Sequence, residues 1–140
     1  MTKNNRRSGC PLPDIHNIKQ YKLFQNQEIK LFKPLENQGH CNINYLLATA
    51  DRKYLIRKFK LKNDRESEFK VQKAVHRVGV GAKPILLDSE NEVMVCEFID
   101  GVHKKRLDRV SLRKLALLIR KLHRVKIRLK AINLKKYFSF

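Results

Sequence analysis

Two strand-like runs joined by four residues constrain the fold of this chain most strongly. "NINYLLAT" covers residues 42–49 and "YLIRKFK" covers residues 54–60, and the four residues "ADRK" connect them. Runs of this kind on both sides of a short connection predict an antiparallel strand pair. Because side chains alternate between the two faces of a strand, Leu55, Arg57 and Phe59 share one face. That face should be buried, so something anionic must meet the Arg57 guanidinium.

The remaining strands follow from three further runs. "LFKPLEN" at residues 31–37 predicts an edge strand because Pro34 interrupts it. "KPILLD" at 83–88 and "EVMVCEFI" at 92–99 predict a fourth and a fifth strand, with "SEN" as the turn between them. Together with the first pair, these runs predict five antiparallel strands.

Two helices complete the predicted fold. "NDRESEFKVQKAVHRVGVG" follows the third strand, with Asn63 and Glu66 as a capping box and Gly79 at its end. "VSLRKLALLIRKLHRVK" at 110–126 carries leucines beyond a single stripe, so we expect it to be covered on more than one side. The fold class is α+β: a five-stranded antiparallel sheet with a packed helix, then a connector and one long helix.

An acid on the first helix is the best candidate to meet Arg57. Glu68 extends the apolar stripe formed by Val71, Ala74, Val75 and Val78. A helix that packs this stripe on the sheet would bring Glu68 near Arg57. Two alternatives remain: Glu68 serves only as a first-turn acid that favours the helix dipole, and Arg57 extends its charge to solvent from an edge.

The composition points to an anionic partner. The 140 residues carry a net charge of +19, and residues 103–140 hold fourteen Lys or Arg against one acid. Such a positive charge would attract nucleic acid, a nucleotide or a membrane surface. The alternative is that the surface is generally lysine-rich and the charge marks no partner. The chain has no Trp, and its aromatic residues do not interleave with the basic ones as stacking platforms do, which disfavours nucleic acid.

Cysteine usage and hydropathy bear on location. The three cysteines, Cys10, Cys41 and Cys96, are scattered and odd in number, which suits a reducing compartment. His40 and Cys41 are adjacent, but no second ligand pair has the spacing of a zinc site. No apolar run reaches the ~18 residues of a membrane span, and the N-terminus has no apolar signal core. We expect a cytoplasmic protein with no membrane partner and no metal site of its own.

The order of these parts resembles the nucleotide-binding lobe of the kinase-like fold, and the sequence resembles the choline kinase and aminoglycoside phosphotransferase family. Five patterns over residues 31–140 carry the resemblance: "LENQGHCNINYLL", "YLIRKF", "ESEFKVQKAV", "VMVCEFIDG" and "LALLIRKLHRVK". Residues 1–30 are expected to form an N-terminal tail with a short helix capped by Asp14. The resemblance implies a nucleotide-binding N-lobe at 31–99, and a hinge connector, long helix and truncated start of the second lobe at 100–140.

The resemblance also implies roles for the residues that match. The hairpin turn of Gly39, His40, Cys41 and Asn42 would lie over the phosphates of ATP, although Gln38 replaces a glycine that is usual in the family. An ordinary hairpin turn is the alternative for this segment. Arg57 would contact phosphate with Glu68 as its partner. The hinge, Glu97, Phe98 and Ile99, would offer backbone groups to the adenine.

The same resemblance shows what the chain lacks. The family's second lobe carries a His-x-Asp loop and a later aspartate that holds magnesium, and the sequence contains no His-x-Asp. We therefore expect no catalytic residue, no magnesium ligand and no phosphotransferase activity in this chain alone. The predicted function is the ATP-binding lobe of a small-molecule kinase for an alcohol such as choline or ethanolamine. The alternatives are a basic nucleic-acid-binding domain and a non-catalytic interaction module.

Overall fold

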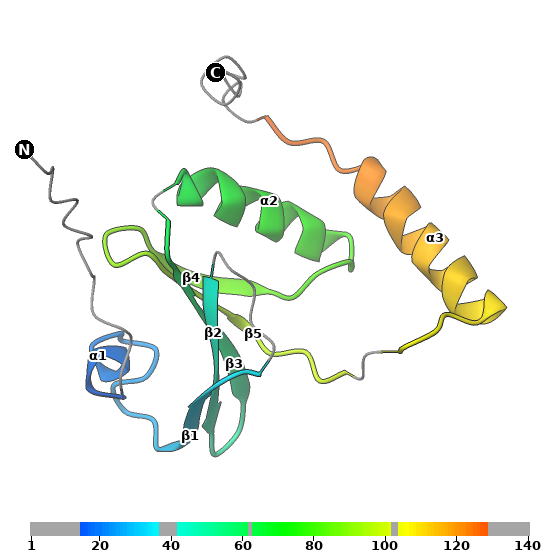
Figure 1. Ribbon diagram of the computed structural model, residues 1–140. Helices are drawn as coiled ribbons and strands as arrows, with labels where there is room; N and C mark the ends of the chain where they lie inside the picture. The colour runs from blue at the N-terminus through cyan, green and yellow to red at the C-terminus, as the bar shows by residue number, and fades with distance from the viewer. Residues whose placement is uncertain (1–14, 37–41, 62, 102–103, 129–140) are drawn as a thin grey trace, which may run out of the picture.

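The computed structural model describes residues 15–36, 42–61, 63–101 and 104–128. Five strands form a single sheet (Figure 1): β1 (Ile29–Pro34), β2 (Asn42–Thr49), β3 (Lys53–Phe59), β4 (Pro84–Asp88) and β5 (Val93–Glu97). Three helices accompany it: α1 (Ile15–Lys19), α2 (Arg65–Arg77) and α3 (Arg109–His123).

All neighbouring strands are antiparallel, in the order β1-β2-β3-β5-β4. The predicted five-stranded α+β fold is therefore confirmed. α2 connects β3 to the edge strand β4, and the chain then returns to the gap beside β3 as β5. The first strand begins at Ile29 rather than at residue 31, and Pro34 ends it. An edge strand tolerates a proline at that place because no partner strand needs the backbone N–H that proline lacks.

The sheet is buried on both faces. One face carries the larger cluster, made of Tyr45, Leu47, Tyr54, Ile56, Val93 and Val95 with Ile18 and Phe24 packed on it. The other face, beneath α2, carries Phe59, Met94 and Cys96 with half-buried neighbours that include Leu55 and Phe69. Residues 93–96 alternate between the two clusters, as the period of a strand requires. This explains why β5 is almost continuously apolar.

The segment from α1 to β1 belongs to the core of the lobe. Ile18 and Phe24 are fully buried, and the Phe24 ring meets the Tyr54 ring edge-on at 5.1 Å between centroids. The Tyr21 hydroxyl donates to Asp88 of β4 at 2.8 Å. The sequence predicted a short helix here but not its packing. This segment covers the sheet face opposite α2 (Figure 1).

The predicted C-terminal end of α2 agrees with the structure, but the predicted N-cap does not. Its N-cap is Asp64, whose carboxylate accepts the Ser67 N–H at 3.0 Å, so the predicted capping by Asn63 is wrong. An aspartate one residue later is an equally good capping residue, and the sequence alone does not separate the two. Gly79 follows the helix with a φ of 72°, and its N–H donates to the His76 carbonyl at 2.8 Å. The predicted glycine terminus is confirmed.

The long helix α3 stands apart from the sheet (Figure 1). Asp108 caps it by accepting the Ser111 N–H, but none of its residues is buried. The cover expected from its many leucines is absent in the described part of the chain, because no other described element packs on them. No helix within the described ranges is long and apolar enough to cross a membrane.

Candidate functional site

Arg57 and Glu68 meet on the α2 side of the sheet. Arg57 Nη1 donates to Glu68 Oε1 at 3.3 Å. Leu55 and Phe59 flank Arg57 on the same face, and Glu68 comes from the first turn of α2. The contact predicted from the strand and helix periods is confirmed, so Arg57 does not simply extend to solvent.

A second arginine shares this carboxylate. Arg65 Nη1 donates to Glu68 Oε2 at 2.9 Å, and the Arg65 side chain is only 8% exposed. Arg65 also pairs with Glu92, which lies just before β5, at 3.1 Å. The sequence analysis missed Arg65 and Glu92. The spacing of three residues between Arg65 and Glu68 on a helix was the signal that could have found the first pair.

Arg57 keeps donors that Glu68 does not use. Its Nε is buried and has no hydrogen-bond partner in the described structure, and the side chain as a whole is 25% exposed. A buried polar group without a partner costs about 1–3 kcal/mol. Only an acceptor that reached Nε itself would remove that cost, whereas the partly exposed part of the guanidinium is open to an anion.

The sheet face around Arg57 is only partly covered. The main contact of α2 with the sheet is at β4, on one edge. Leu46 and Leu55 pair across β2 and β3 and remain half-buried, and Asn44 lies opposite Arg57 in the register. This leaves an apolar strip beside a cation, which is the kind of surface that a nucleotide base and its phosphates require.

The hinge residues begin where β5 ends. The Glu97 N–H donates to the Lys83 carbonyl at 2.8 Å, and the Phe98 N–H donates to the Lys53 carbonyl at 3.2 Å. Ile99 is 63% exposed, and its backbone makes no hydrogen bond to the other described residues. In the register, Arg57 pairs with Met94, three residues before Glu97. The hinge is thus about 10 Å from Arg57 along the strand, and no described residue takes up the Ile99 N–H or carbonyl.

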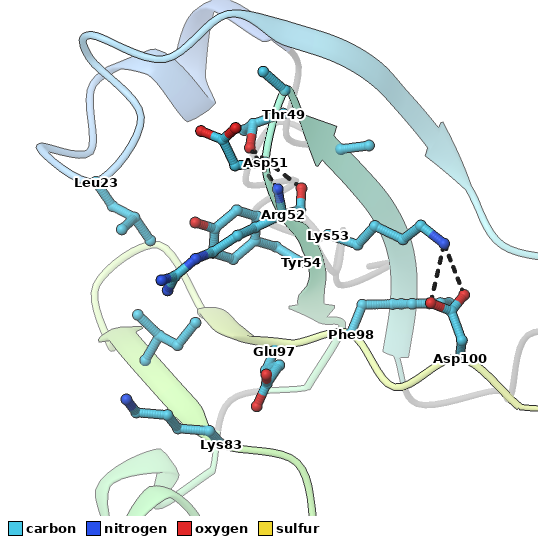
Figure 2. Close-up of a pocket in the computed structure, with 13 residues that line it drawn as sticks. Leu23, Thr49, Asp51, Arg52, Lys53, Tyr54, Lys83, Glu97, Phe98 and Asp100 are labelled. Carbon is cyan, nitrogen blue, oxygen red and sulfur yellow. Dashed lines mark hydrogen bonds and ion pairs between the residues drawn. The ribbon is translucent and has the colours of Figure 1, made fainter.

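A pocket of about 760 Å³ lies where the end of the sheet meets the hinge. Figure 2 shows Leu23, Tyr54 and Arg52 on one side of it and Lys83 on the other, with Glu97 between them. Lys53 Nζ contacts both carboxylate oxygens of Asp100 at 2.9 and 3.0 Å. Arg57 and Glu68 do not line this pocket. The predicted residues therefore fall into two places, an ion pair under α2 and a hinge beside the pocket.

The hairpin residues are only partly within the structure. Gly39, His40 and Cys41 lie outside the described residues. Asn42 begins β2 and pairs with Phe59 in the register, so it lies on the same face as Arg57. Asn42 lies on β2, the strand next to that of Arg57, and pairs with the residue two positions after Arg57.

Cys96 lies at the back of the same face. It is fully buried, and the Gln72 side-chain amide donates to its sulfur at 3.2 Å. Burial raises the pKa of the Cys96 thiol, although the positive charge of Arg57 opposes this effect. The thiol is therefore protonated at neutral pH and acts as a small apolar group in the core.

The described residues do not fit a magnesium ion. No group of three or more His, Cys, Asp or Glu side chains gathers as metal ligands in this part of the chain. The acids near Arg57 are already paired with arginines.

The five-stranded antiparallel sheet and its packed helix are consistent with the fold of a kinase-like amino-terminal lobe. Among solved structures, the chain is similar to an ethanolamine kinase of Plasmodium vivax, with a TM-score of 0.51 and 25% sequence identity. The match covers 79% of this chain and 31% of that kinase, so this chain spans about a third of its length. No protein-family model matches the sequence, and no curated protein matches it.

Proposed function

We propose that this chain is the ATP-binding lobe of a small-molecule kinase, which transfers the γ-phosphoryl group of ATP to the hydroxyl of an ethanolamine- or choline-like alcohol. The observation that carries the proposal is the contact of Arg57 on β3 with Glu68 on α2, in a fold similar to that of an ethanolamine kinase. A strand cation held by a helix acid is the arrangement that kinases use to bind the phosphates of ATP.

Each part of the nucleotide has a proposed partner. Arg57 donates to the α- and β-phosphates with the nitrogens that Glu68 leaves free. Leu46 and Leu55 form the apolar surface under the adenine, and the Ile99 backbone, which bonds to no described residue, hydrogen-bonds its edge. The proposal extends to Gly39, which lies outside the described residues, because a residue without a Cβ would allow backbone amides to approach the phosphates. The net charge of +19 favours a polyanionic ligand.

The proposed role is binding and orientation, not chemistry. The sequence contains no His-x-Asp, so no described group is placed to accept the proton of an acceptor alcohol. We expect the purified chain to show no transfer of phosphate from ATP to ethanolamine or choline. In the intact enzyme we propose that a second lobe supplies the catalytic aspartate and the magnesium ligands and covers the apolar side of α3. Steady turnover by the 140-residue chain would contradict this division of labour.

Isothermal titration of the purified chain with ATP tests the binding role. Arg57→Gln keeps polarity but removes the charge, and Arg77→Gln is a matched control at the exposed end of α2. A hydrogen bond to a charged group contributes about 1.5–3 kcal/mol, so we expect Arg57→Gln to weaken ATP binding at least ~tenfold. The control should bind ATP like the unmodified chain. Equal affinity of both variants would remove the role proposed for Arg57.

A nucleic-acid-binding role is the second candidate, because α3 is exposed and strongly basic. Its basic residues are Arg109, Arg113, Lys114, Arg120, Lys121 and His123, and the helix contains no acid. This role predicts binding to RNA or DNA that weakens steeply with salt and does not compete with ATP. The kinase role predicts a preference for ATP over inorganic tripolyphosphate at equal charge.

A further inference from the structure

Arg65 has more partners than any other charged side chain in the described structure. Its Nε donates to Glu92 at 3.1 Å, its Nη1 donates to Glu68 at 2.9 Å, and its Nη2 donates to the Leu61 carbonyl. The guanidinium carbon lies 3.7 Å from the centroid of the Phe59 ring. All three nitrogens and one face of the guanidinium are thus occupied, at 8% exposure.

The partners of Arg65 are themselves fixed. Glu92 adopts a φ of 52°, a left-handed conformation that is uncommon for a residue with a side chain. Its carbonyl accepts the Phe59 N–H at 2.9 Å, and its carboxylate accepts from Arg65. The end of β3, the turn before β5 and the first turn of α2 are therefore joined through one guanidinium. This arrangement leaves Arg65 little freedom to move.

The position of Arg65 decides how Glu68 can meet Arg57. A carboxylate and a guanidinium on their own favour two parallel hydrogen bonds. Here Glu68 Oε2 is held by Arg65, so Arg57 reaches only Oε1, through Nη1 and at the longer distance of 3.3 Å. The Nε of Arg57 is left buried and unpaired.

We propose that Arg65 is a positioning residue: it holds one oxygen of Glu68 and so prevents Glu68 from closing a two-bond pair with Arg57. The terminal donors of Arg57 that Glu68 does not use, on a side chain that is 25% exposed, are then presented to a phosphate. The part of this inference that concerns phosphate rests on the proposed function. The part that concerns the pairing of Arg57 stands on the geometry of the ligand-free chain.

The ligand-free part is tested by the Nε–H signal of Arg57 in a ¹H–¹⁵N NMR spectrum, assigned by its loss in Arg57→Lys. In Arg65→Met, Glu68 is free to pair with Arg57 through both oxygens, so the Nε–H signal should shift and its exchange with water should slow several-fold. Arg65→Lys retains the charge but lacks the planar fork of the guanidinium, and it should shift the Arg57 Nε–H signal in the same direction. This second variant decides the test if Arg65→Met does not fold. Arg77→Met is the control and should leave the signal unchanged. An Arg57 signal that is the same in both Arg65 variants and the unmodified chain overturns the proposal.

The phosphate part is tested by ATP titration of a double-mutant cycle. Arg65→Met should weaken ATP binding about tenfold when Arg57 is present, and less than about twofold in the Arg57→Gln background, because contacting groups are coupled. A residue that only stabilised the fold would weaken ATP binding equally in both backgrounds, and that result overturns a positioning role for Arg65. If the unmodified chain does not bind ATP at all, the proposed function fails, and the Arg57 Nε–H signal alone decides the role of Arg65.

Discussion

Replacing Phe24 with alanine should destabilise this lobe severely, although Phe24 comes before the first strand. Phe24 is fully buried and meets Tyr54 of β3 edge-on, at 5.1 Å between ring centroids. It packs on the sheet face opposite α2, where Ile18 is also fully buried. Without these two side chains, the cluster around Tyr54 and Ile56 would face water.

The size of the effect follows from the burial. A Phe→Ala change in a protein core costs about 3–5 kcal/mol, because transfer free energy is lost and a cavity remains. Small domains are stabilised by only about 5–15 kcal/mol in total. With a urea dependence of about 1–3 kcal/mol per molar, Phe24→Ala should lower the unfolding midpoint by at least ~1 M. Phe24→Leu, which refills most of the space, should lower it much less.

Urea unfolding followed by circular dichroism measures this difference. Leu107→Ala is the matched control, because Leu107 is 48% exposed in the connector before α3. We expect the control midpoint to lie within experimental error of that of the unmodified chain. If Phe24→Ala and Leu107→Ala have the same midpoint, residues 15–28 are not part of the folded core, and the two-sided burial of the sheet described above is wrong.

Three smaller predictions follow from individual contacts. Asp64→Ala should destabilise the chain by about 1 kcal/mol in the same urea assay, and Asn63→Ala should not, because Asp64 accepts the Ser67 N–H; the reverse order would restore Asn63 as the cap. Although burial alone would raise it, hydrogen bonds from Asn91 and Tyr21 hold the pKa of Asp88 below its usual value. Its contribution to the free energy of unfolding is therefore complete above the ordinary aspartate pKa of about 3.9 and is lost as the pH falls through the lower folded value; Tyr21→Phe should make this acid loss shallower, and an unchanged pH profile would exclude the contact. Because burial raises the pKa of the Cys96 thiol, a chain with Cys96 as its only cysteine should react with a thiol reagent only after urea unfolding; rapid reaction of the native chain would show that the thiol is accessible.

The sheet and the central ion pair could be predicted from the sequence because short-range periodicity determines both. The bounds of β2 match the run at residues 42–49. The period of two places Arg57 beside Leu55 and Phe59, and the helical stripe turns Glu68 toward them, so that their contact follows once α2 packs on the sheet. Each step needed only the local pattern and one packing rule.

The missed features depend on contacts between distant parts of the chain. Ile18 lies in a helix of only five residues and Phe24 follows it, and so short a helix has too few turns to show a period, so their burial could not be inferred. Arg65 resembles a solvent-facing residue in the first turn of a helix. Only the fold of the turn before β5 brings Glu92 to it and makes it a buried residue.

The central claim is that ATP binds between Arg57 and the hinge, and an amide chemical-shift map of the ¹⁵N-labelled chain during ATP titration tests it most directly. ATP should cause saturable shifts that are largest for Arg57 and its neighbours on β3 and for Phe98 and Ile99. Inorganic tripolyphosphate should move the Arg57 amide but leave Ile99 nearly unchanged, because it has no adenine. Shifts confined to α3, or equal for the two ligands at every residue, would show that the chain binds polyanions through its basic surface and would contradict the nucleotide site.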